Sequence, residues 1–230
     1  PPWPWIGTAY SAGDVDLHTS LALDRDGYPH ISYYDASKDD LKVVYRTSTG
    51  WHTTTVDDAG RVGAFTSLAL DQGGHPHISY YDASKGDLKH AYRDGSGWCA
   101  QTVDSPGSVG LYTSLALDAA DHPYISYYDA SNHDLKFARQ DGSGWYIETV
   151  DSAGSVGSFT SIAVDQSGCL HISYYDATNA NLKHAYQDGS GWYVQTVDSA
   201  GSVGLYTSLA LDATGDAYSS YYEAANEDLK

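Results

Sequence analysis

A unit that begins with Thr-Ser-Leu-Ala-Leu-Asp, or a close variant of it, recurs along this chain of 230 residues at a constant spacing. Its copies start at Thr19, Thr66, Thr113, Thr160 and Thr207, each 47 residues after the one before (66 − 19 = 47). The fifth copy reaches only Asp228-Leu229-Lys230, about halfway through the pattern. The missing part is found at the other terminus, because TAYSAGDVDL at 8–17 aligns with TVDSAGSVGL at 196–205. A linear array has no reason to share one repeat between its ends, whereas a closed ring does.

Each repeat is typical of four short strands. In the second copy these are 66–71, 77–82, 87–93 and 98–103, rich in alternating, aromatic and β-branched residues and separated by Gly-, Pro- and Asp-containing turns. No segment shows the apolar spacing of a helix. Four antiparallel strands per unit form one propeller blade. The sequence therefore predicts an all-β, five-bladed β-propeller as a single domain over 1–230. Residues 1–18 complete the last blade, with a strand from Trp5 to Ala9 closing the ring as its outermost strand.

Charge and composition limit the partners of this chain. It carries 30 Asp and Glu against 12 Lys and Arg, a formal net charge of −18. Proteins that bind nucleic acid need clustered Lys and Arg, so we expect no nucleic-acid partner. No apolar run approaches the roughly 20 residues of a membrane helix, so we expect no membrane insertion. The bias toward Tyr, Ser, Thr, Asp and Gly suggests an extracellular or cell-surface location. The start at Pro1 suggests a mature form or an excised domain.

The two cysteines, Cys99 and Cys169, take different positions in the repeat. They therefore do not form a repeated metal site. They could pair in one disulfide, or stay as two semi-buried thiols, which the sequence favours because nothing in it brings them together.

Loops leave the two faces of a propeller alternately. The second-to-third loops of each blade and the inter-blade loops (DASK and DSAGSVG types) share one face and are nearly invariant between copies. The first-to-second loops share the opposite face with the third-to-fourth loops, and the first-to-second loops differ from copy to copy. One face is therefore held constant, either by packing or by a ligand.

The repeated Tyr-Tyr-Asp segment on the constant face is the main candidate site. An aromatic ring can stack on a sugar, and a neighbouring carboxylate can accept hydroxyl hydrogen bonds. Alternatively, both rings pack between blades and the carboxylate only caps its loop by an Asx-turn. The predicted ligand-binding residues are Tyr34, Asp35, Tyr81, Asp82, Tyr128, Asp129, Tyr175, Asp176, Tyr222 and Glu223.

The repetition itself argues against an enzyme. Glycoside hydrolases use two carboxylates of different pKa in unlike environments, whereas almost every carboxylate here has equivalents in the other copies. No fingerprint of a hydrolase, zinc protease or nucleotide-binding protein occurs. The Asp-Leu-Lys segment, such as Asp87 with Lys89, suggests a polar pocket or, more simply, an ion pair that orders its loop. We therefore expect no catalytic residues, no cofactor and no metal site.

With this repeat organisation the chain resembles five-bladed β-propeller lectins of the tachylectin-2 kind, which are also built from five tandem repeats of similar length. The sequence motif of that family is absent here, so none of its binding residues is transferred. The resemblance implies a non-enzymatic, extracellular carbohydrate-binding propeller with up to five equivalent weak sites for glycans or glycoconjugates, which multivalency would strengthen. The alternative is a structural or adhesive module that assembles with other extracellular subunits. A hydrolase with a deep pocket of non-repeated carboxylates is a third, less favoured reading.

Overall fold

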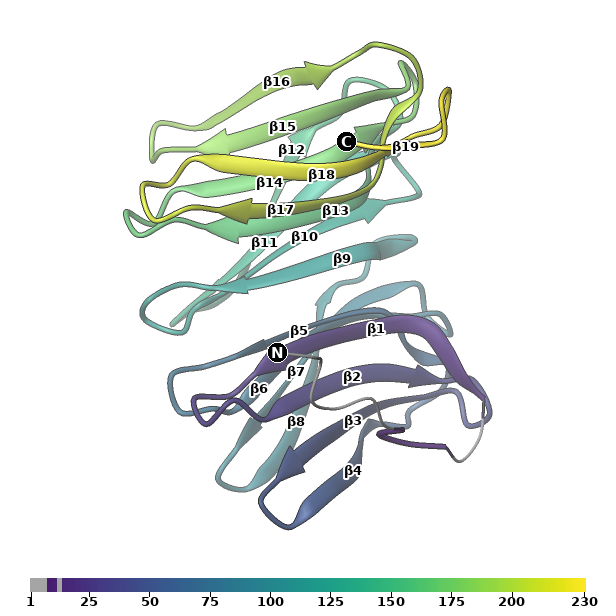
Figure 1. Cartoon of the computed structure of the whole chain (residues 1–230), viewed down its shortest axis with the longest axis vertical. Coiled ribbons are helices and arrows are strands. Elements are labelled where there is room, and N and C mark those ends of the chain that lie inside the picture. Colours follow the sequence, from purple (N-terminus) through teal and green to yellow (C-terminus); the bar gives the residue numbers. More distant parts are fainter. Residues whose placement is uncertain (1–7, 12–13) are drawn as a thin grey trace, which may run out of the picture.

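The repeats fold into successive antiparallel sheets. The computed structural model describes residues 8–11 and 14–230, and within them the chain is a five-bladed β-propeller that contains no helix (Figure 1). Each of the first four repeats forms a four-stranded sheet whose strands lie in chain order, and the last forms a sheet of three strands. The predicted all-β, five-bladed propeller fold is confirmed.

The blades are numbered 1 to 5 in chain order. Blade 1 comprises β1 (Val15–Leu23), β2 (Pro29–Asp35), β3 (Asp40–Thr47) and β4 (Gly50–Asp57). Blade 2 comprises β5 (Val62–Leu70), β6 (Pro76–Asp82), β7 (Asp87–Asp94) and β8 (Gly97–Asp104). Blade 3 comprises β9 (Val109–Leu117), β10 (Pro123–Asp129), β11 (Asp134–Asp141) and β12 (Gly144–Asp151). Blade 4 comprises β13 (Val156–Val164), β14 (Leu170–Asp176), β15 (Asn181–Gln187) and β16 (Trp192–Asp198). Blade 5 comprises β17 (Val203–Leu211), β18 (Ala217–Glu223) and β19 (Asp228–Leu229).

The first strand of each blade is longer than the sequence indicated. In blade 2 it begins at Val62 and not at Thr66, and its pairing with β6 shifts register between Ala64 and Ser67. The extra residue sits at Phe65, which has a φ of 55°. This irregularity is a β-bulge, and a bulge turns side chains away from the regular alternation of a strand.

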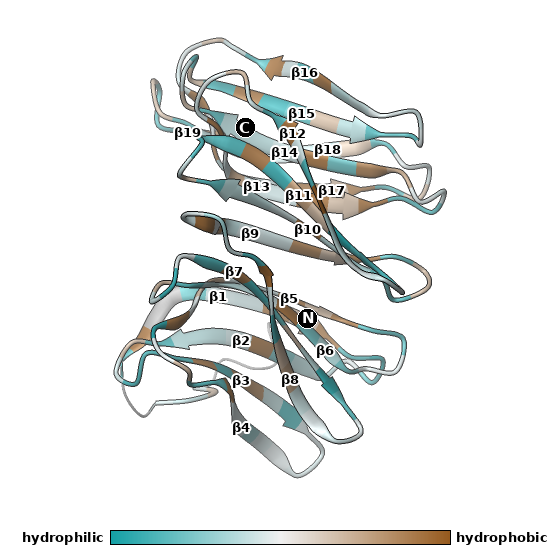
Figure 2. Ribbon diagram, turned by 180° about the vertical axis from the view of Figure 1, so that it is seen from behind, coloured by the Kyte–Doolittle hydropathy of each residue, from teal (hydrophilic) through white to brown (hydrophobic). Residues whose placement is uncertain are grey.

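The hydrophobic core lies between the sheets. Leu41 and Val56 of blade 1 pack against Leu68, Ile78 and other apolar residues of blade 2, and two equivalent clusters join blades 2 to 3 and 3 to 4. Hydrophobic residues therefore occur on strands of every blade, interspersed with polar ones (Figure 2). Because both faces of an inner sheet are covered by neighbours, a blade alone could not bury its apolar residues.

The backbones approach closely at these junctions. Gly110 at the start of β9 has a φ of 103°, and a Cβ there would lie only 2.8 Å from Cα of Leu88. Gly63, Gly157 and Gly204 occupy the same repeat position with the same kind of contact. A glycine is needed at this point both for its backbone angle and for the approach of the preceding blade.

The predicted closing strand from Trp5 to Ala9 lies outside the described residues except for Thr8 and Ala9, so closure by this strand stays a prediction. Tyr10, which follows it, places its ring 5.8 Å from that of Tyr33 in blade 1. The first strands pack side by side in the order β1, β5, β9, β13, β17. Within the described part of the chain, β17 and β1 are not such a neighbouring pair, and Figures 1 and 2 show them on opposite sides of β9.

Both cysteines, Cys99 and Cys169, are free thiols that are partly buried.

Two histidines are buried within blades. His90 of β7 and His184 of β15 each lie beside a second histidine, with nitrogen–nitrogen distances of 3.3 Å to His77 and 3.2 Å to His171. Burial, followed by the neighbouring histidine, lowers the pKa of His90 to about 3 and that of His184 to about 4. Both imidazoles are therefore neutral in the folded protein at neutral pH.

These histidines should make the fold sensitive to mild acid. Their folded pKa values lie below the unfolded value of about 6.5, so unfolding takes up protons and stability falls as pH drops from about 6.5 toward 4. Blade 3 has Phe137 at the same repeat position, so we expect the double variant His90→Phe/His184→Phe to fold. Chemical denaturation between pH 7 and 4.5 should show the parent losing on the order of 2 kcal/mol per histidine more than the variant. Equal losses in both proteins would contradict this assignment.

Candidate functional sites

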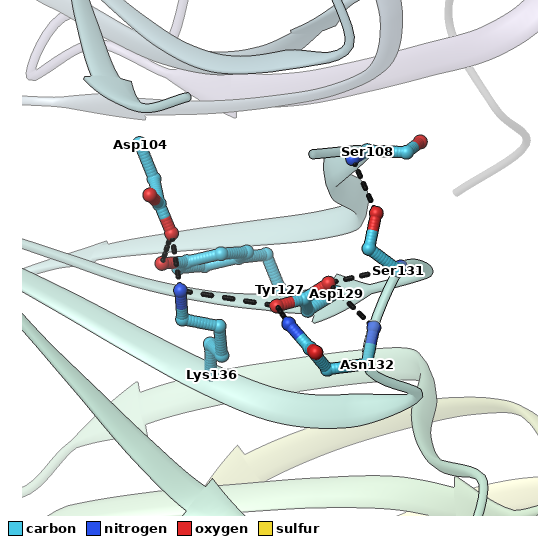
Figure 3. Close-up of polar contacts among 7 residues, drawn as sticks. All are labelled: Asp104, Ser108, Tyr127, Asp129, Ser131, Asn132 and Lys136. Carbon is cyan, nitrogen blue, oxygen red and sulfur yellow. Dashed lines mark hydrogen bonds and ion pairs between the residues drawn. The ribbon is translucent and has the colours of Figure 1, made fainter. Parts of the chain in front are cut away.

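In blades 2 to 5 the first tyrosine of the Tyr-Tyr-Asp segment lies in the junction with the preceding blade. In blade 3, Tyr127 is fully buried and donates a hydrogen bond of 2.6 Å to Asp104, at the end of the fourth strand of blade 2 (Figure 3). Lys136 of β11 donates to the same carboxylate oxygen over 2.6 Å. We call this arrangement of Asp, Tyr and Lys the junction triad. The equivalent triads are Asp57 with Tyr80 and Lys89, Asp151 with Tyr174 and Lys183, and Asp198 with Tyr221 and Lys230.

In each junction triad the aspartate and the lysine form an ion pair, and the tyrosine donates a hydrogen bond to the same aspartate. Burial alone would raise the pKa of the Asp57 carboxyl, but hydrogen bonds from Lys89 and Tyr80 outweigh this effect and hold the pKa below its usual value. Burial, together with the hydrogen bond to Asp57, raises the pKa of Tyr80. The aspartate is therefore charged and the tyrosine protonated at neutral pH, as a structural ion pair requires.

Sequence reasoning missed the partner of the lysine. Asp87 and Lys89 were expected to pair within one loop, whereas Lys89 forms its ion pair with Asp57 of the preceding blade. The signal was present, because the aspartate of the Thr-Val-Asp segment recurs at Asp57, Asp104, Asp151 and Asp198. Its role depends on a contact between consecutive repeats, which the pattern within one repeat does not reveal.

The carboxylate of each Tyr-Tyr-Asp segment is buried and caps its own loop. Asp129 accepts hydrogen bonds from the backbone N–H groups of Ser131 (2.9 Å) and Asn132 (3.0 Å), and from the Asn132 side chain (Figure 3). Asp82 and Asp176 make the same turn, and Asp35 and Glu223 are buried at the same position. This is the Asx-turn geometry weighed above.

The second tyrosines lie nearer the surface than the first, but Tyr34 and Tyr128 are still buried, at 8% and 9% exposed, and several hydroxyls form hydrogen bonds. Tyr34 bonds to Asp39, Tyr81 to Ser108 (3.0 Å) and Tyr128 to His133 (2.8 Å). Tyr175 and Tyr222 are partly buried. The ten predicted ligand-binding residues are thus brought together pairwise within each blade, and their binding of a ligand stays a prediction.

A row of aromatic side chains runs along the first strands of the blades, and sequence reasoning did not single it out. The bulged position just before each Thr-Ser motif carries His18, Phe65, Tyr112, Phe159 and Tyr206, and consecutive rings have centroids 4.4 to 4.8 Å apart. Together with the following threonines they line a hollow of about 250 Å³. The signal was an aromatic residue at one fixed repeat position in every copy.

Larger hollows lie on the opposite face, at the junctions between neighbouring blades. They are lined by turns between first and second strands, turns between third and fourth strands, and the ends of the second and third strands. The volumes are about 610 Å³ between blades 1 and 2, about 270 Å³ between blades 2 and 3, and about 430 Å³ between blades 3 and 4. The first and third are within the size range of small-molecule sites. The variable loops therefore shape hollows that are alike in position and different in lining.

The hollow between blades 3 and 4 combines both charges with aromatic rings. Arg139 of β11 places its guanidinium 4.9 Å from the ring centroid of Tyr146, which is exposed. Glu148 of β12 also lines the hollow and accepts a hydrogen bond of 3.2 Å from the indole N–H of Trp192 in blade 4. In other copies the position of Arg139 is tyrosine, and that of Glu148 is threonine or glutamine. This constellation is specific to blade 3.

No group of three or more His, Cys, Asp or Glu side chains suited to a metal ion occurs among residues 8–11 and 14–230. In the same residues no helix has the length and hydropathy needed to cross a membrane.

Comparison with solved structures yields several propellers at low sequence identity. The chain is similar to a protein of unknown function from Dyadobacter fermentans, with a TM-score of 0.64, 9% identity, and 89% of this chain and 74% of that chain covered. It is also similar to the Aleuria aurantia lectin in complex with Fucα1-6GlcNAc, with a TM-score of 0.60, 15% identity, and 89% and 74% covered. These likenesses establish the propeller fold.

A third similar structure is an α-L-arabinofuranosidase from Clostridium thermocellum, with a TM-score of 0.53, 11% identity, and 94% of this chain and 85% of that chain covered. No protein-family model matches the chain, and no curated protein matches it. The sequence identities are too low to transfer a function from any of these proteins.

The junction triad can be tested with two adjacent aspartates. Asp57 is buried in a triad, whereas Asp58 is exposed. Replacing Asp57 by Asn leaves Lys89 buried without its counter-ion and should lower the free energy of unfolding by about 3–5 kcal/mol, whereas Asp58→Asn should change it by less than about 0.5 kcal/mol. Urea unfolding at pH 7 measures both.

The pH dependence of this difference provides a second check. Because the folded pKa of Asp57 is lowered, its stabilisation is present above the unfolded pKa and is lost as pH falls below about 4. The difference in the free energy of unfolding between the parent and Asp57→Asn should therefore become smaller below about pH 4. If Asp57→Asn and Asp58→Asn were equally stable at pH 7, the triad would not be a stabilising interaction.

Proposed function

We propose that this protein is a non-enzymatic carbohydrate-binding propeller whose glycan sites are the junction hollows on the variable face. The observation that carries the proposal is the hollow between blades 3 and 4, where Arg139, Glu148 and the exposed ring of Tyr146 converge on a space of about 430 Å³. An aromatic ring can stack on the apolar face of a sugar, while charged groups bond strongly to its hydroxyls.

The position of Glu148 supports a binding role. Its carboxylate is partly buried, and one of its oxygens accepts a hydrogen bond from the Trp192 indole N–H. The same carboxylate also lines the hollow, where a ligand can reach it. Arg139 is exposed and stacks on Tyr146, which limits the freedom of a long side chain before a ligand binds. Groups that are already ordered lose less entropy on binding.

The other hollows suggest further sites of the same class. In the hollow between blades 1 and 2, the rings of His30 and Tyr45 stack at 5.5 Å, and Arg25 and Arg46 belong to the lining. The hollow between blades 2 and 3 has His77, Tyr92 and His122. Because these linings differ, we expect sites of unequal affinity that act together on a glycan-bearing surface. Such a role fits an extracellular or cell-surface location.

The lining of this hollow favours binding over catalysis. Glu148 is the only carboxylate in the lining of the hollow between blades 3 and 4, among the residues the structure describes. Hydrolysis of a glycosidic bond by the usual mechanism needs a pair of carboxyl groups on opposite sides of that bond. The lectin and arabinofuranosidase with similar folds show that propellers of this shape occur in both classes. The lining of this hollow agrees with a binding protein such as the lectin.

Glycan-array binding at several protein densities tests the proposal. We expect density-dependent binding to a restricted set of sugars, and Arg139→Ala should weaken it about tenfold or more through loss of a charge-assisted contact. Arg93→Ala removes an exposed arginine of β7 that lines none of these hollows, and it serves as the matched control. No binding to any sugar at any density, or equal effects of the two variants, would contradict the proposal.

A further inference from the structure

A stacked pair of side chains recurs on the outer two strands of the blades, and in blade 3 this pair carries a charge. In blade 4 the rings of Tyr186 and Tyr193 stack with their centroids 5.0 Å apart. In blade 3 the same positions hold Arg139 and Tyr146, which are cross-strand partners, and the guanidinium lies 4.9 Å from the ring centroid. Tyrosine occupies the position of Arg139 in blades 1, 2 and 4, so packing does not require an arginine there. Blade 3 therefore keeps the stack and adds a positive charge.

This arginine has no counter-ion in the part of the chain that the structure describes. Lys89, Lys136 and Lys183 each form an ion pair with a buried aspartate, whereas Arg139 forms none and contacts the ring of Tyr146. The neighbouring Asp141 accepts hydrogen bonds from the backbone N–H and the hydroxyl of Ser143, within its own turn. In a chain with 30 acidic and 12 basic side chains, an arginine without an ion pair is available to an external anion.

The guanidinium is placed where a ligand can reach it. Its N–H groups lie in one plane, so a face that rests on a ring leaves them able to donate, and their fork matches the two oxygens of a carboxylate. Arg139 is exposed and lines the hollow of about 430 Å³ between blades 3 and 4. Blade 4 contributes Gly168, Gly189 and Gly191 to the lining, and a Cβ at any of them would have no neighbouring atom within 4 Å. The blade 4 side of the hollow is therefore open enough to admit a ligand group.

Glu148 gives the hollow two ends of opposite charge. It lies on β12, two residues after Tyr146, and one of its oxygens accepts a hydrogen bond from the Trp192 indole N–H. Arg139 and Glu148 line the same hollow without forming an ion pair with each other. A ligand between them would direct an anionic group toward Arg139 and hydroxyl groups, which donate, toward Glu148. A sugar that carries a carboxylate has both kinds of group on one ring.

We propose that the hollow between blades 3 and 4 binds an acidic sugar, namely a pyranose that carries a carboxylate, as in a uronic acid or a sialic acid. Arg139 donates two N–H hydrogen bonds to the carboxylate, and Glu148 accepts hydrogen bonds from the ring hydroxyls. This inference rests on the proposed carbohydrate-binding function and names the ligand class of one of its sites. No other copy of the repeat combines an arginine and a glutamate at these positions, so the preference belongs to this hollow.

The probes are two methyl glycosides that differ in one group. Methyl β-glucuronide carries a carboxylate where methyl β-glucoside carries a CH₂OH group. Titrations of ¹⁵N-labelled protein are followed by NMR through the Nε–H signals of its five arginines, and the signal of Arg139 is the one that Arg139→Tyr removes. We expect the glucuronide to shift this signal and to bind about tenfold or more tightly than the glucoside, because its contact with Arg139 is charge-assisted. A methyl α-sialoside, titrated in the same way, distinguishes the two sources of the carboxylate.

Two variants that lower the net charge equally separate a local contact from long-range electrostatics. Arg139→Tyr introduces the residue of the other copies, so the stack should be kept, while the affinity for the glucuronide should fall to that for the glucoside. Arg93→Gln removes an exposed arginine outside this hollow, and glutamine is the residue at its position in blades 3 and 4. This control should keep the tenfold preference. Circular dichroism checks that both variants are folded.

The outcomes distinguish a failure of this inference from a failure of the proposed function. Equal affinity for the two glycosides, with the Arg139 signal shifted by both, would support a carbohydrate site in the hollow and overturn its preference for an acidic sugar. Tighter binding of glucose 6-sulfate than of the glucuronide would overturn the carboxylate as the anionic group. No shift of the Arg139 signal with any of these sugars would overturn both the inference and the placement of a glycan site in this hollow.

Discussion

The ion pair and hydrogen bond that cross each blade junction are the interaction on which this structure depends. The triad joins the end of one repeat to the middle of the next, so an isolated repeat would leave a charged lysine and a carboxylate without partners. The apolar residues beside it likewise need the neighbouring blade for their burial. Stability and architecture are therefore properties of consecutive repeats, as in other repeat proteins.

This requirement explains why one face of the propeller is constant and the other varies. The Tyr-Tyr-Asp segments, their loops and the inter-blade loops are connected by the triads, by Asx-turns and by hydrogen bonds that Ser84, Ser131 and Thr178 accept from the inter-blade loop preceding their own blade. In the first-to-second turns of the opposite face, the leading aspartate accepts a hydrogen bond from a backbone N–H four residues on, but the other side chains of these turns differ from blade to blade. Variation in these turns produces hollows of different chemistry on one scaffold, because surface loops can change while the rigid fold that carries them does not.

Much of the fold could be predicted from the sequence, because periodicity at 47 residues and turn signals within each repeat are local features. The burial of Asp82 and Asp129 depends on how the second-to-third loop folds over the carboxylate, and the sequence left this open. The role of Asp57 was missed because its partners lie 23 and 32 residues away in the next blade. The hollow lined by Arg139 and Glu148 of blade 3 and by Gln187 of blade 4 was missed because it combines residues of two blades, whereas comparison of the copies directs attention to repeated residues.

A crystal structure of the chain with its best-bound glycan would test the central claim most directly, namely that the constant face holds the propeller together and the variable face binds. The account predicts a sugar between blades 3 and 4, in contact with Arg139, Glu148 and Tyr146, with the triads unchanged. A sugar seated on the second tyrosines of the Tyr-Tyr-Asp segments, such as Tyr81 and Tyr128, with the hollow empty, would contradict it.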